Sequence, residues 1–282
     1  MVDRKLGAMA TWVIVGAGYT GGRLAERLIA EGHEVVVTRR QPGAAAGAAA
    51  GLGPRARGLT VDLGSPSTLA GAIPEDAIVV CLAPPGGDPG GEIEALVAAC
   101  AKARRLVYVS STGVYAPGGG AWVDESWPIA PVTASGKARV AAEAALRDGD
   151  IALRVAGIHG PGRGVVDRIK AGTYRIVGDG SAHVSRIHVD DLVEAIVRAG
   201  TSEVSGPVNV ADDDPAPIGE VADAIAAKLG LPPPPRVAVE SVNPEVAGML
   251  TADRRIANRR MKDELGVVLR YPSWRLLLRN SV

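Results

Sequence analysis

The chain has 282 residues, enough for one large domain, or a large and a small one, with a complete hydrophobic core. Its 31 Lys and Arg residues balance 31 Asp and Glu residues, so it has no electrostatic footprint for nucleic acid or for an anionic membrane. The sequence contains no Phe, so the core has to be built from Val, Leu, Ile and Ala.

The cysteines and the apolar runs indicate the compartment. Cys81 and Cys100 have neither CxxC nor metal-ligand spacing, which predicts buried, reduced thiols. No apolar run is long enough to cross a bilayer, and no apolar segment typical of a signal peptide precedes Thr11. We therefore expect a cytoplasmic protein without a membrane partner, in which residues 1–10 form an irregular leader.

A strand, a glycine turn and a helix are predicted in succession near the start of the chain. Thr11–Val15 is a β-branched run, and apolar side chains at helical spacing follow it at Leu24, Leu28 and Ile29. The segment Gly16–Gly21 between them has the GxGxxG pattern. In this context the pattern predicts a turn whose backbone amides hold the pyrophosphate of a dinucleotide.

Each glycine of this turn has an expected role. Gly16 would make the turn, Gly18 would let the backbone approach the phosphates, and Gly21 would let the helix pack on the strand. Tyr19 and Thr20 lie between the second and third glycines and are expected at the cofactor.

The end of the second predicted strand, Glu34–Thr38, indicates which dinucleotide binds. Proteins that bind NAD usually have Asp or Glu here to hold the ribose hydroxyls, but this chain has Thr38 followed by Arg39 and Arg40. A guanidinium can bind a 2'-phosphate through paired, charge-assisted hydrogen bonds. The sequence therefore predicts NADP in preference to NAD.

The next segments continue the alternation of strand and helix after a low-complexity Ala and Gly tract, Gly43–Gly53. We expect a strand ending at Asp62 and Leu63 in the adenine pocket, and a loop starting at Ala83 and Pro84 beside the cofactor. The remaining predicted elements are a short helix over Ser67–Ala72, a buried strand over Ala77–Leu82, a helix over Glu92–Ala103 and a buried strand over Arg105–Ser110. This order predicts an α/β protein with a doubly wound parallel sheet, the Rossmann fold.

From Ser110 onward a set of motifs resembles one family. The motifs are the run Val109–Tyr115, then Val123–Glu125, Pro131, Lys137, Glu143, Leu153 with Arg154, Gly160 with Pro161, and Arg186–Leu192. In order and context they resemble the extended short-chain dehydrogenases/reductases, the epimerase and dehydratase superfamily, from Thr11 to about Val210.

The resemblance implies an oxidoreductase in which a hydride moves between nicotinamide and a substrate carbon. By alignment Ser111 would hold the substrate oxygen, and Lys137 would bind the nicotinamide ribose. The family's catalytic tyrosine, four residues before this lysine, is replaced by Thr133. The spacing puts Thr133 and Lys137 on one helix face, but a threonine alcohol is far less acidic than a phenol.

A second departure concerns the substrate. Family members that act on nucleotide sugars have an asparagine three residues after the arginine of the sixth strand, and here that residue is Gly157. Together with Thr133, this makes the chain similar to atypical members that keep the fold and the cofactor site. Tyr115 and His159 are alternative proton donors. A third option is a substrate, such as an iminium or an activated alkene, that needs little help from an acid.

The clustered residues His183, His188, Asp190 and Asp191 raise the question of a metal site. We interpret them as the end of a strand followed by a carboxylate that caps the next helix, so no metal is expected.

The carboxyl-terminal third is expected to form a small substrate lobe. A last strand over Pro207–Val210 and a helix over Ile218–Leu229 precede the spacer Pro232–Pro235. We expect residues 10–157 and 186–211 to form the dinucleotide-binding domain, and residues 158–185 and 212–282 to form the lobe, which contains Met249, Arg254, Arg255, Tyr271 and Trp274. The cleft between them is the expected substrate site.

These observations leave three hypotheses for function. The first is an NADP-dependent oxidoreductase of the atypical extended type that acts on a small carbonyl or alcohol compound. The second is an NADP-binding redox sensor or interaction protein without turnover, and the third is a sugar epimerase or dehydratase, which Thr133 and Gly157 disfavour. Relatives commonly dimerise through two exposed helices, so a homodimer is one expected assembly.

Overall fold

A computed structural model describes residues 9–280 of the chain, so most of the predicted leader lies outside the described residues. The first half of the chain alternates strands and helices as predicted. Its elements are β1 (Thr11–Val15), α1 (Tyr19–Ala30), β2 (Glu34–Arg39), α2 (Ala44–Ala50), β3 (Ala56–Thr60), η1 (Pro66–Leu69), β4 (Ile78–Cys81), α3 (Pro89–Ala99), β5 (Arg105–Ser111) and η2 (Thr112–Val114).

The second half has shorter strands and less regular spacing. Its elements are β6 (Trp122–Val123), α4 (Ala134–Ala144), β7 (Ile151–Val155), β8 (Gly157–His159), α5 (Val165–Lys170), β9 (Ile176–Val177), β10 (His183–Val184), β11 (Arg186–His188), α6 (Val189–Thr201), β12 (Gly206–Val210), β13 (Ala216–Pro217), α7 (Ile218–Lys228), β14 (Arg236–Val237), η3 (Val239–Ser241), α8 (Pro244–Leu250), β15 (Arg255–Ile256), α9 (Arg259–Asp263) and α10 (Leu276–Asn280).

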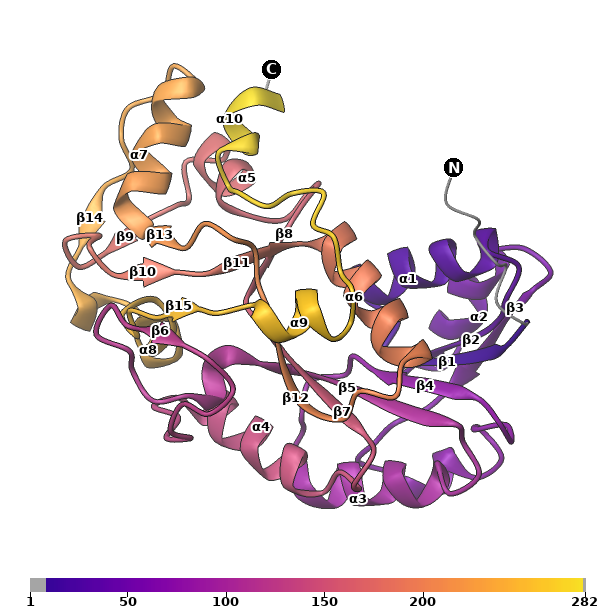
Figure 1. The fold of residues 1–282 in the computed structure, drawn as a ribbon. Coiled ribbons are helices and arrows are strands. Elements are labelled where there is room, and N and C mark those ends of the chain that lie inside the picture. The colour runs from indigo at the N-terminus through magenta and orange to yellow at the C-terminus, as the bar shows by residue number, and fades with distance from the viewer. Residues whose placement is uncertain (1–8, 281–282) are drawn as a thin grey trace. The chain divides into compact units, whose positions relative to one another are not determined.

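A seven-stranded parallel sheet in the order β12-β7-β5-β4-β1-β2-β3 forms the centre of the fold. The chain starts at β1, moves outward through β2 and β3, and then returns to the other side of β1 at β4. The strand order therefore reverses between β1 and β4, which is where doubly wound sheets bind ligands. In Figure 1, α1 and α3 lie on opposite sides of β1 and β4. This confirms the predicted Rossmann-type α/β fold.

The described chain forms two compact units. One contains the residues up to Val109 together with Ala141–Ala152 and Ala199–Gly206, and the other contains Ser110–Val140, Leu153–Arg198 and the residues from Pro207 onward. The boundaries of these units differ from the boundaries of the predicted domains. The predicted assignment of residues to a cofactor domain and a substrate lobe stays a prediction.

Apolar strands build the core of the first unit. Val13 of β1 pairs with Val36 on one side and with Val79 on the other. Val13, Val79 and Leu106 are all fully buried. Cys81 and Cys100 are also buried, as predicted, and neither forms a disulfide.

The second unit has a separate core that joins segments far apart in sequence. Ile169 and Ile176 pack with Val221 and Ile225 of α7, and with Trp274 near the end of the chain. Trp274 is 1% exposed. Residues of the region 158–185 therefore share one core with residues of the carboxyl-terminal third.

Two helices differ from the predicted elements for identifiable reasons. The Ala and Gly tract contains α2, which packs closely on β3 because Gly58 has no side chain; a Cβ atom at Gly58 would overlap the Ala45 carbonyl oxygen. Helix α3 begins earlier than expected because Asp88 caps it, with its carboxylate accepting a hydrogen bond from Gly91 N at 3.2 Å and Pro89 in the first turn. Within the described part of the chain, no helix combines the length and apolar character needed to span a membrane.

A glycine in the first unit offers a test of this packing. A Cβ atom at Gly200 would lie 2.6 Å from Cζ3 of the buried Trp12 ring, whereas one at Gly47 of α2 would meet no atom within 4 Å. We expect Gly200→Ala to lower the free energy of unfolding by about 1–3 kcal/mol, because overpacking a core is destabilising. Gly47→Ala should raise it by about 0.5–1 kcal/mol, because alanine favours the helix. Urea denaturation measures both changes, and equal effects would contradict the packing described.

Candidate functional site

The glycine turn after β1 has no room for side chains on its inner side. Gly16 has φ +90°, and a Cβ atom there would lie 2.8 Å from Ala83 N. A Cβ atom at Gly21 would lie 3.0 Å from Gly16 O and 3.1 Å from Cγ2 of Ile14 in β1, so this glycine allows α1 to pack on the strand, as predicted. Gly18 has no atom within 4 Å of the place that its Cβ would occupy. The turn is therefore closely packed at Gly16 and Gly21 and open at Gly18.

The start of α1 can hold an anion. Gly18 is the N-cap residue, no side chain caps the helix, and its first turn contains no acidic residue. The partial positive charge of the helix terminus is therefore not offset by a carboxylate of that turn. Thr20 is buried, and the half-buried Tyr19 ring lies 4.0 Å from the Arg23 guanidinium carbon.

Thr38 has a role that the sequence analysis missed. It is 1% exposed, and its Oγ1 accepts a hydrogen bond from Gly16 N at 3.2 Å. Its carbonyl oxygen also accepts from Ala17 N at 3.0 Å. Thr38 therefore holds the glycine turn in place from the end of β2. Strand alternation alone cannot show that this hydroxyl points at the turn.

Arg39 and Arg40 are both exposed at the end of β2. Within residues 9–280, no ion pair involves either guanidinium, so neither positive charge is offset by a neighbouring carboxylate. Both side chains are available to an anionic ligand.

The other predicted cofactor residues lie in ordered loops of the first unit. The Asp62 carboxylate accepts from Gly64 N at 3.2 Å, and Leu63 is 7% exposed. Ala83 is half-buried and Pro84 is exposed. The loop that they begin is fixed by Glu92, which is 8% exposed and accepts from Gly86 N at 2.8 Å. The sequence analysis did not single out Glu92.

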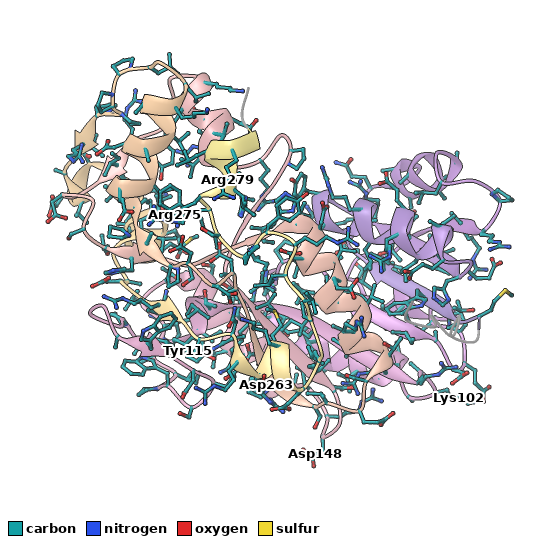
Figure 2. The ribbon with its side chains drawn as sticks, turned by 45° about the horizontal axis from the view of Figure 1, so that its top comes forward. Lys102, Tyr115, Asp148, Asp263, Arg275 and Arg279 are labelled. Carbon is teal, nitrogen blue, oxygen red and sulfur yellow. The ribbon has the colours of Figure 1, made fainter. Side chains whose placement is uncertain are left out.

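Ser111 and Tyr115 are both engaged in local contacts of the second unit. Ser111 is half-buried, and its Oγ accepts from Gly113 N at 3.0 Å at the start of η2. Tyr115, labelled in Figure 2, is fully buried. Its hydroxyl donates to Asn209 Oδ1 at 2.8 Å and accepts from Arg154 Nη1 at 3.0 Å. The Tyr115 hydroxyl therefore has both a donor and an acceptor partner in the protein.

Thr133 caps a helix in this structure. It is 6% exposed, and its Oγ1 accepts from Gly136 N at 3.0 Å at the start of α4. Glu245 of α8 supports the same helix start, because its carboxylate accepts from Ala134 N at 2.5 Å and from Ser135 Oγ at 2.7 Å. Lys137 lies one turn later and is exposed. Thr133 thus lies just before α4 and not within it, with its hydroxyl bound to the backbone.

His159 ends β8 at the wall of a cavity in the second unit. It is 8% exposed, and its Nε2 has no hydrogen-bond partner among the described residues. Burial, together with the nearby His188 and Arg186, lowers the pKa of His159 to about 4. The imidazole is therefore neutral at pH 7 and is a poor proton donor there.

The start of α6 differs from the prediction of a capping carboxylate. His188 Nδ1 accepts from Asp190 N at 3.2 Å, so an imidazole fills this place. The buried Asp191 instead accepts from Arg270 N and Tyr271 N, each at 2.9 Å. His183 Nδ1 lies 2.8 Å from Asp253 Oδ1. In residues 9–280, no three His, Cys, Asp or Glu side chains gather closely enough to hold a metal ion.

Residues 16–202 match the family model described as NAD(P)H-binding. The chain belongs to this NAD(P)H-binding family. A curated relative is the 3-diazoavenalumate denitrifying reductase of a Streptomyces species, which is 35% identical over an alignment of 198 residues that covers 63% of this chain. The alignment spans 65% of that relative's length.

Solved structures extend the likeness over nearly the whole chain. A conserved protein of unknown function from Silicibacter pomeroyi is 31% identical with a TM-score of 0.78, covering 96% of this chain and 97% of that one. A human epimerase family protein determined with NADPH is 22% identical with a TM-score of 0.76 and coverage of 96% and 98%. The dTDP-glucose 4,6-dehydratase of Streptomyces venezuelae with NAD is 19% identical, with a TM-score of 0.79 and coverage of 96% and 95%. The chain therefore belongs to an NAD(P)H-binding family and has the fold of these epimerase and dehydratase structures.

The buried imidazole of His159 predicts a pH dependence of stability. Its pKa is about 4 in the folded protein, against about 6.5 in an unfolded chain. Between these values the unfolded chain binds more protons, so stability is lost as the pH falls through this window. Protonation of His159 should make the wild type lose up to about 3 kcal/mol of stability between pH 6.5 and pH 4. We expect His159→Gln, which has no imidazole to protonate, to lack this part of the loss. Urea denaturation across this range measures it, and identical pH profiles would contradict the buried, neutral imidazole.

Proposed function

We propose that the protein is an NADP(H)-dependent oxidoreductase that acts on a small carbonyl or alcohol compound. The observation that carries this proposal is the glycine turn of α1 together with Arg39 and Arg40. The helix start has no capping side chain, and both guanidiniums are exposed without an ion pair among the described residues. The NADPH bound to the human epimerase family protein supports the choice of NADP, although other similar structures hold NAD.

The residues of this chain would divide the work as follows. The amides at the start of α1 would hold the pyrophosphate, and Arg39 and Arg40 would hold the 2'-phosphate. Lys137 would bind the nicotinamide ribose, and Ser111 would orient the substrate oxygen. When bound, the cofactor supplies or accepts the hydride. Ser111 would then place the carbonyl or alcohol for that transfer.

The handling of the proton favours a substrate that needs little acid help. The Thr133 hydroxyl caps α4, the Tyr115 hydroxyl is bound by Asn209 and Arg154, and His159 is neutral at pH 7. The predicted proton donors are Tyr115 and His159. Of these, His159 borders a cavity, so it is better placed to meet a bound compound. An iminium or an activated alkene fits this set of residues without a strong acid. The curated relative is named a reductase, which supports the direction of reduction.

The second candidate is an NADP-binding protein without turnover. It is favoured by Thr133, because the position of the family's tyrosine is used here to cap a helix. A sugar epimerase or dehydratase is disfavoured, because Gly157 is exposed and brings no side chain to a substrate phosphate.

The cofactor preference can be tested with a variant in which both arginines are replaced. We expect the double substitution Arg39→Ser and Arg40→Ser to weaken NADPH binding by about tenfold to a hundredfold, since hydrogen bonds to charged groups contribute about 1.5–3 kcal/mol. NADH binding should change by less than about twofold, because NADH has no 2'-phosphate. Isothermal titration calorimetry measures both, with Lys228→Ser, an exposed charge at the end of α7, as the control. Tighter binding of NADH than NADPH to the wild type would overturn the choice of NADP.

Turnover can be tested with Ser111→Ala. On a panel of carbonyl, iminium and activated alkene compounds, we expect this variant to lower kcat/KM by about a hundredfold, the scale of losing one positioned donor. NADPH binding should stay unchanged, and Ser67→Ala, an exposed serine of η1, should behave as the wild type. The measurement is the loss of NADPH absorbance. NADPH binding without turnover on the whole panel would favour the non-catalytic alternative.

A further inference from the structure

The start of α4 is held by a carboxylate from a distant part of the chain. Glu245 of α8, 111 residues after Ala134, accepts from Ala134 N at 2.5 Å and from Ser135 N at 3.4 Å. It also accepts from Ser135 Oγ at 2.7 Å. The next amide, Gly136 N, donates to Thr133 Oγ1 instead. Within the described part of the chain, the first two amides of α4 therefore have no partner other than Glu245.

This helix start carries Lys137, the residue assigned to the nicotinamide ribose. Lys137 N donates to Thr133 O at 3.1 Å, so the lysine lies in the first turn of α4. Its side chain is exposed, and among residues 9–280 no hydrogen bond or ion pair holds its ammonium. Because the ammonium has no other attachment, the backbone at the start of α4 sets where it can reach.

The same turn of α4 also packs against the segment that contains Ser111. A Cβ atom at Gly136 would overlap Gly113 O, so the helix start and η2 are in direct contact. Ser111 Oγ in turn accepts from Gly113 N at 3.0 Å. A shift of the α4 start would therefore disturb both Ser111 and Lys137.

Helix α8 adds little to the core of the protein. None of its residues, Pro244–Leu250, is buried. Gly248 lets α8 lie close to the start of α4, because a Cβ atom there would be 2.7 Å from Thr133 Cγ2. Hydrogen bonds from Ser135 lower the pKa of Glu245, so its carboxylate is ionised at pH 7 and suits the partial positive charge of a helix start. Loss of this carboxylate should therefore change the start of α4 without removing a part of the core.

We propose that Glu245 is a positioning residue for the cofactor, which keeps Lys137 where its ammonium meets the nicotinamide ribose. This inference rests on the proposed function, because the ribose is assigned to Lys137 there. Glu245 acts through the helix start and needs no contact with the cofactor. Without its carboxylate, Ala134 N and Ser135 N would bind water, and the first turn of α4 would fray. Lys137 would then spend part of its time away from the ribose.

Calorimetry with the whole cofactor and with half of it tests this role. Adenosine 2',5'-bisphosphate has the adenine, its ribose and the 2'-phosphate but lacks the nicotinamide ribose. We expect Glu245→Ala to weaken NADPH binding to the full chain by about fivefold, and binding of the bisphosphate by less than about twofold. Equal weakening of both compounds, or unchanged NADPH binding, would refute the positioning role. Glu240→Ala, at an exposed glutamate of η3, is the matched control and should bind NADPH as the wild type does.

A double variant shows whether Glu245 acts through Lys137. Lys137→Ala alone should weaken NADPH binding by about tenfold or more, since hydrogen bonds to charged groups are strong. Adding Glu245→Ala should weaken binding by less than about twofold further, because two changes that act through one group are not additive. A further loss of about fivefold would mean that Glu245 acts independently of Lys137, and the proposal would fail. Glu245→Gln keeps an acceptor oxygen and should weaken NADPH binding less than Glu245→Ala does.

Hydrogen exchange measures the helix start without any cofactor. In Glu245→Ala, the amides of Ala134 and Ser135 should exchange about tenfold faster than in the wild type, because they lose their acceptor. Exchange at the wild-type rate would overturn the inference. A wild type that binds NADPH, with Glu245→Ala binding it equally well, contradicts this inference alone. A wild type that binds no NADPH contradicts the proposed function, and this inference with it.

Discussion

The close approach of the turn after β1 to the end of β4 is the constraint on which the cofactor end of the fold depends. Leu82 N and Ala83 N both donate to Val15 O, and the left-handed Gly16 that follows has space for no side chain beside Ala83. Thr38 at the end of β2 binds the same turn through its hydroxyl and its carbonyl. The carboxyl ends of three neighbouring strands are thus tied together. These contacts fix the start of α1, where exposed backbone N–H groups can bind the pyrophosphate of a dinucleotide.

The second unit uses for structure several polar groups that the sequence pattern makes candidates for chemistry. Thr133 and Glu245 cap α4, and Ser111 caps η2. The Tyr115 hydroxyl lies between Asn209 and Arg154 in a fully buried position. Moving this buried hydroxyl away would leave its two hydrogen-bond partners unpaired, which costs free energy. Of the two predicted proton donors, Tyr115 and His159, His159 is the one with a ring nitrogen that has no partner among the described residues.

The sequence predicted local elements well where one local signal dominates. The β-branched run of β1, the glycine turn and the apolar periodicity of α1 each agree with the structure. It was less informative at α2, which packs on β3 because Gly58 allows it. It was wrong at α6, where the neighbouring His188 accepts from Asp190 N in place of a capping carboxylate. Thr38 shows the same limit. In the sequence, Thr38 indicates only that no carboxylate is present at this position. In the structure, its hydroxyl accepts a hydrogen bond from Gly16 N in the turn.

By itself, the sequence determined the fold class, the family and the dinucleotide turn, because these depend on residue types at fixed short spacing. Strand, GxGxxG turn and helix follow one another within Thr11–Ala30, and no distant contact is needed to recognise them. Only the tertiary structure decided which side chains are free to act. Tyr115 and His159 are both candidate proton donors along the chain, but partners from other elements bind the Tyr115 hydroxyl, and the fold leaves His159 at a cavity wall. The physical reason is that hydrogen-bond partners and burial come from residues far apart in sequence, which local patterns do not encode.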